Sequence, residues 1–316
     1  MAKLVKREKQ KNLTLRDFYT KRNKILIWMK LGGLGDVLYQ RMIFEDFKDL
    51  IPEADFTFAC PEAYIDAAID HPDLKEVISS NNVNTDDYLI NYNTCVTMAH
   101  NYESINAPCE ENRADVWAKL CGVNLKKHNM KFNLKQDLKE KCKKEITKEN
   151  KKTIIFAPTS AMISKSLLQH QIDTIVECTK DYNLIAIHSR EIPELKKHNI
   201  QVINTSIKKW MCYISAADYV ISVDSAAFHM AGGLGKEVLG IFTWADGYAC
   251  GKHYPNAKYI QLHRKNGNWD CGPCFKFEDC KKSNKCIKPC LTEITKEMIE
   301  DGVKRLLKNS SNLEKN

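Results

Sequence analysis

A glycine-rich segment near the N-terminus is the first place where this sequence could do chemistry. Residues 29–40 read MKLGGLGDVLYQ. Gly32, Gly33 and Gly35 let the backbone turn sharply and approach a ligand closely, and the helix expected to start near Asp36 presents unpaired N–H groups to an anion. The segment lacks the third glycine of a dinucleotide-binding fingerprint. From spacing alone, Asp36 is equally well a helix N-cap or a catalytic group.

A second candidate segment lies at residues 223–242, VDSAAFHMAGGLGKEVLGIF. Asp224 and Ser225 are expected at the carboxyl end of a strand, and His229 follows Ser225 by one helical turn on the same face. Asp224 could hold a ribose hydroxyl, and the amides of Ser225 and Ala226 could receive a diphosphate. Taken alone, His229 is more simply a partly buried histidine with a satisfied hydrogen bond.

The third candidate segment is APTSAMISKS at residues 157–166. The hydroxyls of Thr159 and Ser160 and the ammonium of Lys165 could bind phosphate oxygens, because hydroxyls donate hydrogen bonds and an ammonium neutralises charge. The alternative is a polar loop with an N-cap serine, and this segment alone does not decide between the two.

A group of cysteines near the C-terminus offers a fourth kind of chemistry. The chain has 13 cysteines. Cys271 and Cys274 form a CGPC pair with two residues between them, and Cys286 and Cys290 form a second pair with three residues between them. Such pairs suit a structural zinc ion or, less well, an iron–sulfur cluster. Free thiols are an equally good interpretation, so the sequence leaves the metal open.

Apolar runs and helical periodicity predict individual elements along the chain. Among them we expect strands at residues 153–157 and 219–223 and helices at residues 62–69 and 226–233.

Short apolar strands alternate with amphipathic helices on both sides of a lysine-rich segment at residues 135–152, where we place the linker. This order predicts parallel sheets covered on both faces. The chain therefore divides into four expected parts: a basic tail at 1–23, an acceptor domain at 24–145, a donor domain with the Cys-rich end at 151–292, and a C-terminal helix at 293–316 that packs back on the first domain.

The composition is that of a globular protein, with 43% hydrophobic and 28% charged residues. No run approaches the ~20 apolar residues that cross a bilayer, and no secretory signal is recognisable, so we expect a cytoplasmic protein, free or peripheral at the inner membrane surface. The formal net charge of +8 favours anionic partners.

Together the three loop segments resemble the heptosyltransferase-like glycosyltransferases of family 9, over about residues 24–307. The most specific matches are LGGLGDVLYQ, DSAAFHMAGGLGKEVLGIF and the CGPC-containing end. The resemblance implies an α/β chain of the GT-B type, with two Rossmann-like doubly wound domains facing a central cleft. It also implies an inverting sugar transfer that requires no metal or other cofactor.

The resemblance assigns roles to particular residues. It makes Asp36, the aspartate of the GDV triplet, the base that activates the acceptor hydroxyl, with Gly33 and Gly35 in the acceptor-side loop. Eight residues would bind the donor: Thr159, Ser160, Lys165, Glu191, Asp224, Ser225, Ala226 and His229. The implied partners are an ADP-sugar donor and a lipopolysaccharide core or related glycan as acceptor.

Residues 80–112 depart from the usual acceptor-binding region of that family, which leaves the acceptor open. Two alternatives follow from the charge and the cysteines. One is a glycosyltransferase that acts on a modified DNA base, and the other is a non-catalytic module that binds nucleotide or nucleic acid. The joint presence of Asp36 and Asp224 argues against the non-catalytic module, because a pure binder needs no base in a cleft.

Overall fold

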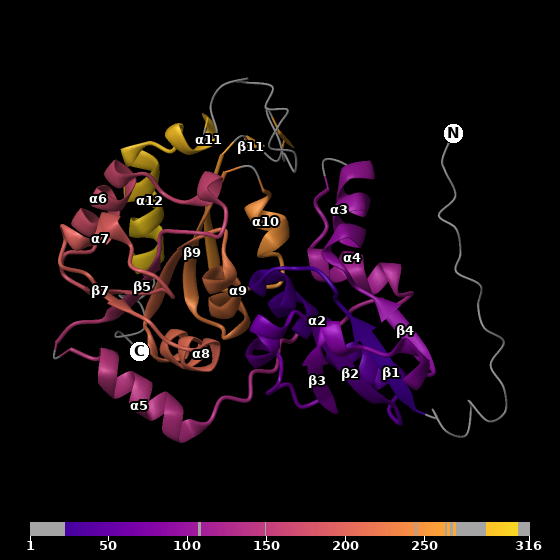
Figure 1. Ribbon diagram of the computed structural model, residues 1–316. Helices are drawn as coiled ribbons and strands as arrows, with labels where there is room; N and C mark the ends of the chain where they lie inside the picture. Colours follow the sequence, from indigo (N-terminus) through magenta and orange to yellow (C-terminus); the bar gives the residue numbers. More distant parts are fainter. Residues whose placement is uncertain are drawn as a thin grey trace, which may run out of the picture.

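The computed structural model describes residues 23–106, 109–148, 150–243, 245–262, 264–265, 268–269 and 289–308. Two parallel sheets stand side by side in this part of the chain (Figure 1). The first has the strand order β3-β2-β1-β4, and the second has the order β10-β9-β8-β5-β6-β7. The predicted α/β architecture with two Rossmann-like sheets is confirmed. The expected basic tail lies almost entirely outside the described residues.

The first sheet and its helices come from residues 24–120. The strands are β1 (Lys24–Trp28), β2 (Asp55–Cys60), β3 (Glu76–Ser79) and β4 (Ile90–Asn93). The helices are α2 (Leu34–Leu50), α3 (Val96–Ile105) and α4 (Arg113–Leu120), with 3-10 turns η1 (Glu62–Ala67), η2 (Ser80–Asn82) and η3 (Thr85–Asp87).

The second sheet and its helices follow from residue 136. The strands are β5 (Thr153–Ala157), β6 (Asn183–Ile187), β7 (Gln201–Ile203), β8 (Tyr219–Val223), β9 (Glu237–Phe242) and β10 (Ala257–Gln261), with a small ribbon of β11 (Arg264–Lys265) and β12 (Asn268–Trp269). The helices are α5 (Gln136–Ile146), η4 (Ile163–Lys165), α6 (Gln169–Cys178), α7 (Pro193–Lys196), α8 (Ile207–Ala216), α9 (Ala226–Gly233), α10 (Gly247–Cys250), α11 (Pro289–Thr292) and α12 (Lys296–Leu307).

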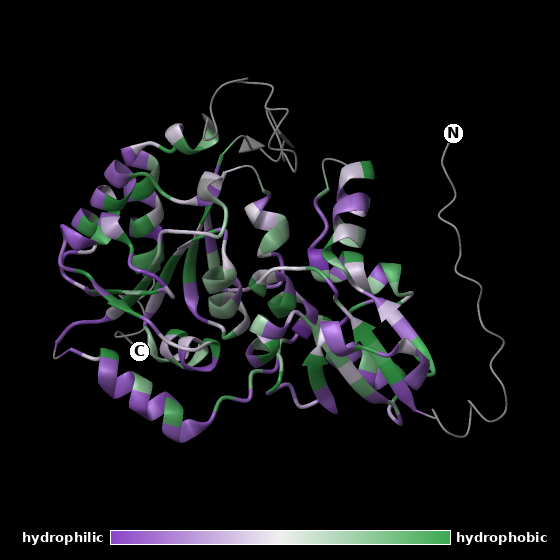
Figure 2. Ribbon diagram, viewed as in Figure 1, coloured by the Kyte–Doolittle hydropathy of each residue, from purple (hydrophilic) through white to green (hydrophobic). Residues whose placement is uncertain are grey.

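The central strands explain why these segments fold as they do. Every residue of β5 and β8 is buried, and the two strands pair in parallel with Ile155 opposite Val220. Strands that are covered on both faces need apolar side chains at every position rather than alternate ones. Figure 2 shows these hydrophobic strands inside and hydrophilic helices such as α5 outside.

Each sheet has a topological switch point, where the order in which successive strands are added changes direction. In the first sheet the switch point lies between β1 and β4, and in the second it lies between β5 and β8. Open parallel sheets bind ligands at the carboxyl ends of the strands beside a switch point, because the loops that follow the two neighbouring strands run in opposite directions and leave a crevice. The loops after β1, β5 and β8 are the three segments singled out by the sequence.

The two sheets are joined mainly through α2 and α9, which pack against each other in the middle of the molecule (Figure 1). Gly35 permits this approach, since a Cβ atom there would lie 3.3 Å from Cδ2 of His229. The side-chain amide of Asn112 adds hydrogen bonds to the carbonyls of Ala249 (2.9 Å) and Cys250 (3.1 Å).

The expected packing of the C-terminal helix on the first domain is wrong for the described residues up to 308. Helix α12 packs against α6, β9 and β10 of the second sheet. Its apolar stripe of Ile299, Val303 and Leu306 is buried there in one cluster with Leu239 and Ile260. The apolar stripe predicts a buried face, but it does not say which sheet will cover it.

The segment expected to link the domains contains α5, which packs against α8 through its buried residues Cys142 and Ile146. Lys141, Lys143 and Lys144 of α5 are exposed and form the solvated face that the sequence predicts. No helix in the described part of the chain is both long enough and apolar enough to span a membrane.

A buried arginine ties α2 to the segment that leads toward the second sheet. The Arg41 side chain is fully buried and donates hydrogen bonds to Asp70 (2.7 Å) and to the carbonyls of Ala67 (2.8 Å), Met130 (2.8 Å) and Lys131 (2.9 Å). Removing it takes a hydrogen-bond donor from three backbone carbonyls and the compensating charge from Asp70, which is more costly than losing an exposed ion pair.

We therefore expect Arg41→Met to lower the free energy of unfolding by about 3–5 kcal/mol in urea titrations. The control is Arg305→Met, because the bonds of Arg305 to Asp301 and to the Tyr259 carbonyl are exposed and should contribute little. Equal effects of the two substitutions would contradict the structural role given to Arg41.

Candidate functional site

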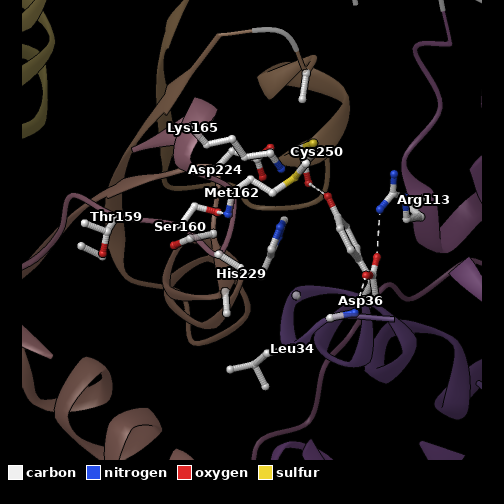
Figure 3. Close-up of a pocket in the computed structure, with 18 of the residues that line it drawn as sticks. Leu34, Asp36, Arg113, Thr159, Ser160, Met162, Lys165, Asp224, His229 and Cys250 are labelled. Carbon is white, nitrogen blue, oxygen red and sulfur yellow. Dashed lines mark hydrogen bonds and ion pairs between the residues drawn. The ribbon is translucent and has the colours of Figure 1, made fainter. Parts of the chain in front are cut away.

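A cleft of about 500 Å³ lies between the carboxyl ends of the two sheets. Figure 3 shows Asp36 and Arg113 on one side of it and Lys165 and Asp224 on the other, with His229 between them. The cleft brings together all but one of the described residues assigned to the active site, namely Gly33, Gly35, Asp36, Thr159, Ser160, Lys165, Asp224, Ser225, Ala226 and His229.

Asp36 is the third residue of α2, and Gly33 is the N-cap. Oδ2 of Asp36 accepts a hydrogen bond from the Gly33 amide at 2.8 Å. Oδ1 accepts one from Nη1 of Arg113, also at 2.8 Å. The side chain is 15% exposed. The prediction that Asp36 is the N-cap is therefore wrong, because the helix begins two residues earlier; Asp36 instead accepts the amide of the N-cap residue and presents its carboxylate to the cleft.

Arg113 is the functional residue that the sequence did not reveal. Its guanidinium bridges two carboxylates, because Nε and Nη2 each donate to Glu103 at 2.9 Å while Nη1 donates to Asp36. Burial alone would lower the pKa of Arg113, but the charges of Asp36 and Glu103 outweigh it and hold the pKa well above its usual value. This arginine therefore stays charged and fixes the orientation of Asp36.

The opposite wall holds a second ion pair. Nζ of Lys165, in the loop after β5, lies 2.6 Å from Oδ2 of Asp224, at the end of β8. Burial would raise the pKa of Asp224, but the charge of Lys165 outweighs it and keeps that pKa below its usual value. The pair joins the loops after β5 and β8, which lie on the two sides of the switch point in the second sheet.

Hydroxyl groups surround this pair. Oγ1 of Thr159 is buried and, among the described residues, has no hydrogen-bond partner. The Ser160 amide donates to Oγ of Ser166 at 3.0 Å, which fixes the loop after β5. Ser225 is the N-cap of α9 but makes no capping hydrogen bond, since its hydroxyl lies 3.0 Å from that of Ser222. The start of α9 is thereby left able to bind an anion.

His229 lies on α9 with only 4% of its surface exposed. Its Nδ1 is 3.2 Å from the Tyr254 hydroxyl, and its ring centroid is 4.3 Å from that of Tyr39. Burial lowers its pKa to about 4, so the ring is neutral at pH 7. Both sequence interpretations apply, because His229 is a buried and partnered histidine that also lines the cleft.

Two other sets of expected site residues are not among the described residues that line the cleft. The side chain of Glu191 is 78% exposed, pairs with Lys196 at 2.6 Å and does not line the cavity. Of the four candidate metal ligands, Cys271, Cys274 and Cys286 lie outside the described residues, while Cys290 lies on α11.

The neutral state of His229 predicts a specific dependence of stability on pH. The ordinary pKa of about 6.5 in the unfolded chain falls to about 4 in the folded one. The unfolded state therefore binds more protons between these values, and stability is lost as the pH falls from about 6.5 to 4, by about 3 kcal/mol in total. Below pH 4 both states are protonated and this loss is complete.

We expect His229→Gln to remove this part of the acid sensitivity, even if the variant is less stable at neutral pH. Urea unfolding of both proteins at pH 7.5 and 4.5 measures it. An unchanged difference between the two pH values in the variant would show that His229 is not the responsible group.

The fold is similar to those of several solved glycosyltransferases. A family 9 glycosyl transferase from Veillonella parvula shares 13% identity over 92% of this chain and 98% of its own, with a TM-score of 0.67. E. coli heptosyltransferase WaaC, solved with ADP-2-deoxy-2-fluoro heptose, shares 13% identity over 89% of this chain and 99% of its own, with a TM-score of 0.57. The iron-containing dodecameric glycosyltransferase TibC of E. coli H10407 shares 14% identity over 92% of this chain and 77% of its own, with a TM-score of 0.65.

At these identities the likeness shows the fold, which is of the GT-B type. A comparison with curated protein sequences gave no match. Family membership comes from a separate comparison, in which residues 96–284, more than half of the chain, match the model described as glycosyltransferase family 9 (heptosyltransferase). The matched region contains both Arg113 and the whole Lys165–Asp224 wall of the cleft. The chain therefore belongs to glycosyltransferase family 9, the heptosyltransferase family.

Proposed function

We propose that this protein transfers a heptose-like sugar from a nucleoside diphosphate sugar to an acceptor hydroxyl, with inversion at the anomeric carbon. One observation carries the proposal: a part-buried carboxylate at the start of α2, Asp36, faces a wall of the second sheet that is lined by Lys165 and by hydroxyl groups. In this proposal residues 24–145 bind the acceptor and residues 151–292 bind the donor.

The donor diphosphate would bind where three features converge. The first turn of α9 offers backbone N–H groups at Ser225 and Ala226, which favour an anion. Lys165 supplies the positive charge, and the hydroxyls of Thr159 and Ser160 supply neutral donors. Because Lys165 already neutralises Asp224, an incoming diphosphate would share that ammonium. We infer an ADP-sugar, since WaaC and TibC have been solved with ADP-linked heptoses.

The transfer would be a single displacement at the anomeric carbon. The acceptor oxygen forms a bond to that carbon as the bond from the carbon to the diphosphate oxygen breaks, and the nucleoside diphosphate leaves with the electron pair. The acceptor proton passes to the carboxylate of Asp36. One displacement inverts the configuration. Lys165 and the start of α9 would stabilise the charge that develops on the leaving group.

Fixed contacts hold the base in position for this step. The Gly33 amide occupies Oδ2 of Asp36 and Arg113 occupies Oδ1, so the carboxylate cannot rotate freely. A carboxylate has about four lone-pair sites, which leaves room for an acceptor hydroxyl. His229 is neutral at pH 7 because of its low pKa, so we assign it to shaping the wall and to neutral hydrogen bonding rather than to protonating the leaving group.

For the acceptor we propose a lipopolysaccharide core or a related glycan, bound at the inner membrane surface. The support is family membership together with the described activity of the similar E. coli enzymes. We also propose that Cys271, Cys274, Cys286 and Cys290 bind a structural metal, zinc or iron, because the similar TibC is described as iron-containing. Metal analysis of the purified chain, before and after replacing Cys271 and Cys274, tests this.

The base assignment predicts that Asp36→Asn lowers kcat by about 10²–10⁴-fold, because the amide cannot accept the proton. Stabilisation of the protein by the nucleoside diphosphate should persist, since Asp36 is not in the donor wall. Transfer assays and thermal melts with ADP measure the two effects. The matched control is Asp301→Asn on α12, which is 66% exposed and far from the cleft lining. An Asp36→Asn enzyme with full activity would refute the assignment.

The donor-site assignment predicts that Lys165→Met weakens binding of ADP by about 10–100-fold, the value of one charge-assisted hydrogen bond. The measurement is the ligand-dependent shift in melting temperature of each protein relative to its own ligand-free form, which cancels any loss of intrinsic stability. Lys196→Met is the control because its ion pair is largely exposed. Wild-type affinity in Lys165→Met would place the diphosphate elsewhere.

A further inference from the structure

Three side chains of the kind that bind metals meet at the seam between the two sheets, outside the cleft lining. They are Asp115, the third residue of α4; His128, between α4 and α5; and His253, three residues after α10. Nε2 of His128 lies 2.6 Å from Oδ1 of Asp115, and Nε2 of His253 lies 2.8 Å from Oδ2. One ligand atom from each residue falls within 4.8 Å of the others.

The arrangement of the two imidazoles is specific. Their rings are stacked, with centroids 3.5 Å apart and planes 17° from parallel, so that both turn Nε2 to the same carboxylate. His128 reaches this position with a φ angle of +51°, a left-handed backbone conformation that is uncommon for a residue other than glycine. Such conformations persist where surrounding contacts require them, and they gather at functional sites.

The charge around the group leaves it open to a cation. Among the residues that the structure describes, the ion-pair partners of Asp115 are the two histidines, with no lysine or arginine beside them. The side chains of His128, Asp115 and His253 are 18%, 25% and 16% exposed, so the group is partly covered but within reach of solvent. The nearby Lys127 is held by Glu45 and Asp49.

We propose that Asp115, His128 and His253 bind one divalent transition-metal ion, with zinc as the best-matched candidate. Two imidazole nitrogens and one carboxylate oxygen form a common ligand set for such ions, which leaves a fourth position for water. Ligand atoms at the usual ~2.0–2.1 Å from zinc lie about 3.3 Å apart in a tetrahedron. The present N–O separations would therefore open by somewhat less than an ångström as the rings tilt apart.

The ion would link the two halves of the molecule, because Asp115 and His128 follow the first sheet whereas His253 belongs to the second. Helix α4 also carries Arg113, two residues before Asp115, and α10 contributes Cys250 to the cleft lining. Nε2 of His253, shortly after α10, lies 2.8 Å from Oδ2 of Asp115 on α4, so the two helices are connected at this group. Metal binding here would fix the distance between these helices and hence the width of the cleft mouth.

The test compares metal content among full-length proteins that differ only at this site. Wild type, His128→Gln, His253→Gln and a control, His198→Gln, are stripped with a chelator, loaded with Zn²⁺, dialysed and analysed for zinc per chain. His198 is a matched control because it also pairs with an aspartate, Asp173, but away from the seam. We expect wild type and control to hold one zinc ion more than either variant, and zinc to raise the melting temperature of wild type by more than that of the variants.

Metal bound by cysteines is separated from this site by its spectrum. Loading with Co²⁺ should leave any thiolate charge-transfer absorption unchanged in His128→Gln and His253→Gln while one ion is lost. X-ray absorption of zinc-loaded wild type provides a readout that needs no variant, and it should show imidazole nitrogen ligands. Equal zinc content in all four proteins, or sulfur as the sole ligand of the bound zinc, would overturn the proposal.

Discussion

The close contact between α2 and α9 is the constraint on which the rest of this structure depends. Both helices begin at the carboxyl ends of central strands, and a Cβ on Gly35 would already lie 3.3 Å from His229. This contact turns the carboxyl ends of the two sheets toward one another. It also directs the starts of two helices, each carrying a partial positive charge, at one cleft. The loops after β1, β5 and β8 can then act on the same ligand.

The charges in the cleft follow from this arrangement. Arg113 forms ion pairs with two carboxylates, those of Asp36 and Glu103, whereas Lys165 forms an ion pair with one, that of Asp224. The pairing on the first wall leaves an excess of negative charge, which suits a proton acceptor. On the second wall the Lys165–Asp224 pair is neutral by itself, and hydroxyls and the N–H groups at the start of α9 remain for an anion. Burial strengthens each of these interactions because water no longer screens them.

Much of the fold could be predicted from the sequence where one physical cause dominates. Strands β5 and β8 and helix α9 were placed correctly, since strands buried on both faces require continuous apolar runs and glycine-rich turns mark their ends. Helix α3 was missed because it lies in a polar stretch, and few of its residues are buried. The helix expected at residues 62–69 is the shorter 3-10 turn η1.

The site was predictable to a different degree. Asp224 directly follows β8, and Asp36 and Lys165 lie in the segments that come after β1 and β5. These residues could be assigned to one sheet edge because parallel strands end there together. Arg113 could not, because its partners Glu103 and Asp36 are 10 and 77 residues away and nothing local marks the pairing. The same holds for α12, whose apolar stripe fits either sheet in principle, and for Asp115 with His253, which are 138 residues apart.

A crystal structure of the full chain with a bound ADP-sugar analogue that cannot be transferred would show directly whether donor and base face each other across the cleft. We predict that the diphosphate lies against Nζ of Lys165 and the first turn of α9, and that the carboxylate of Asp36 faces the anomeric carbon from the side opposite the diphosphate. A diphosphate bound away from α9, or an Asp36 carboxylate on the same side as the leaving group, would contradict it.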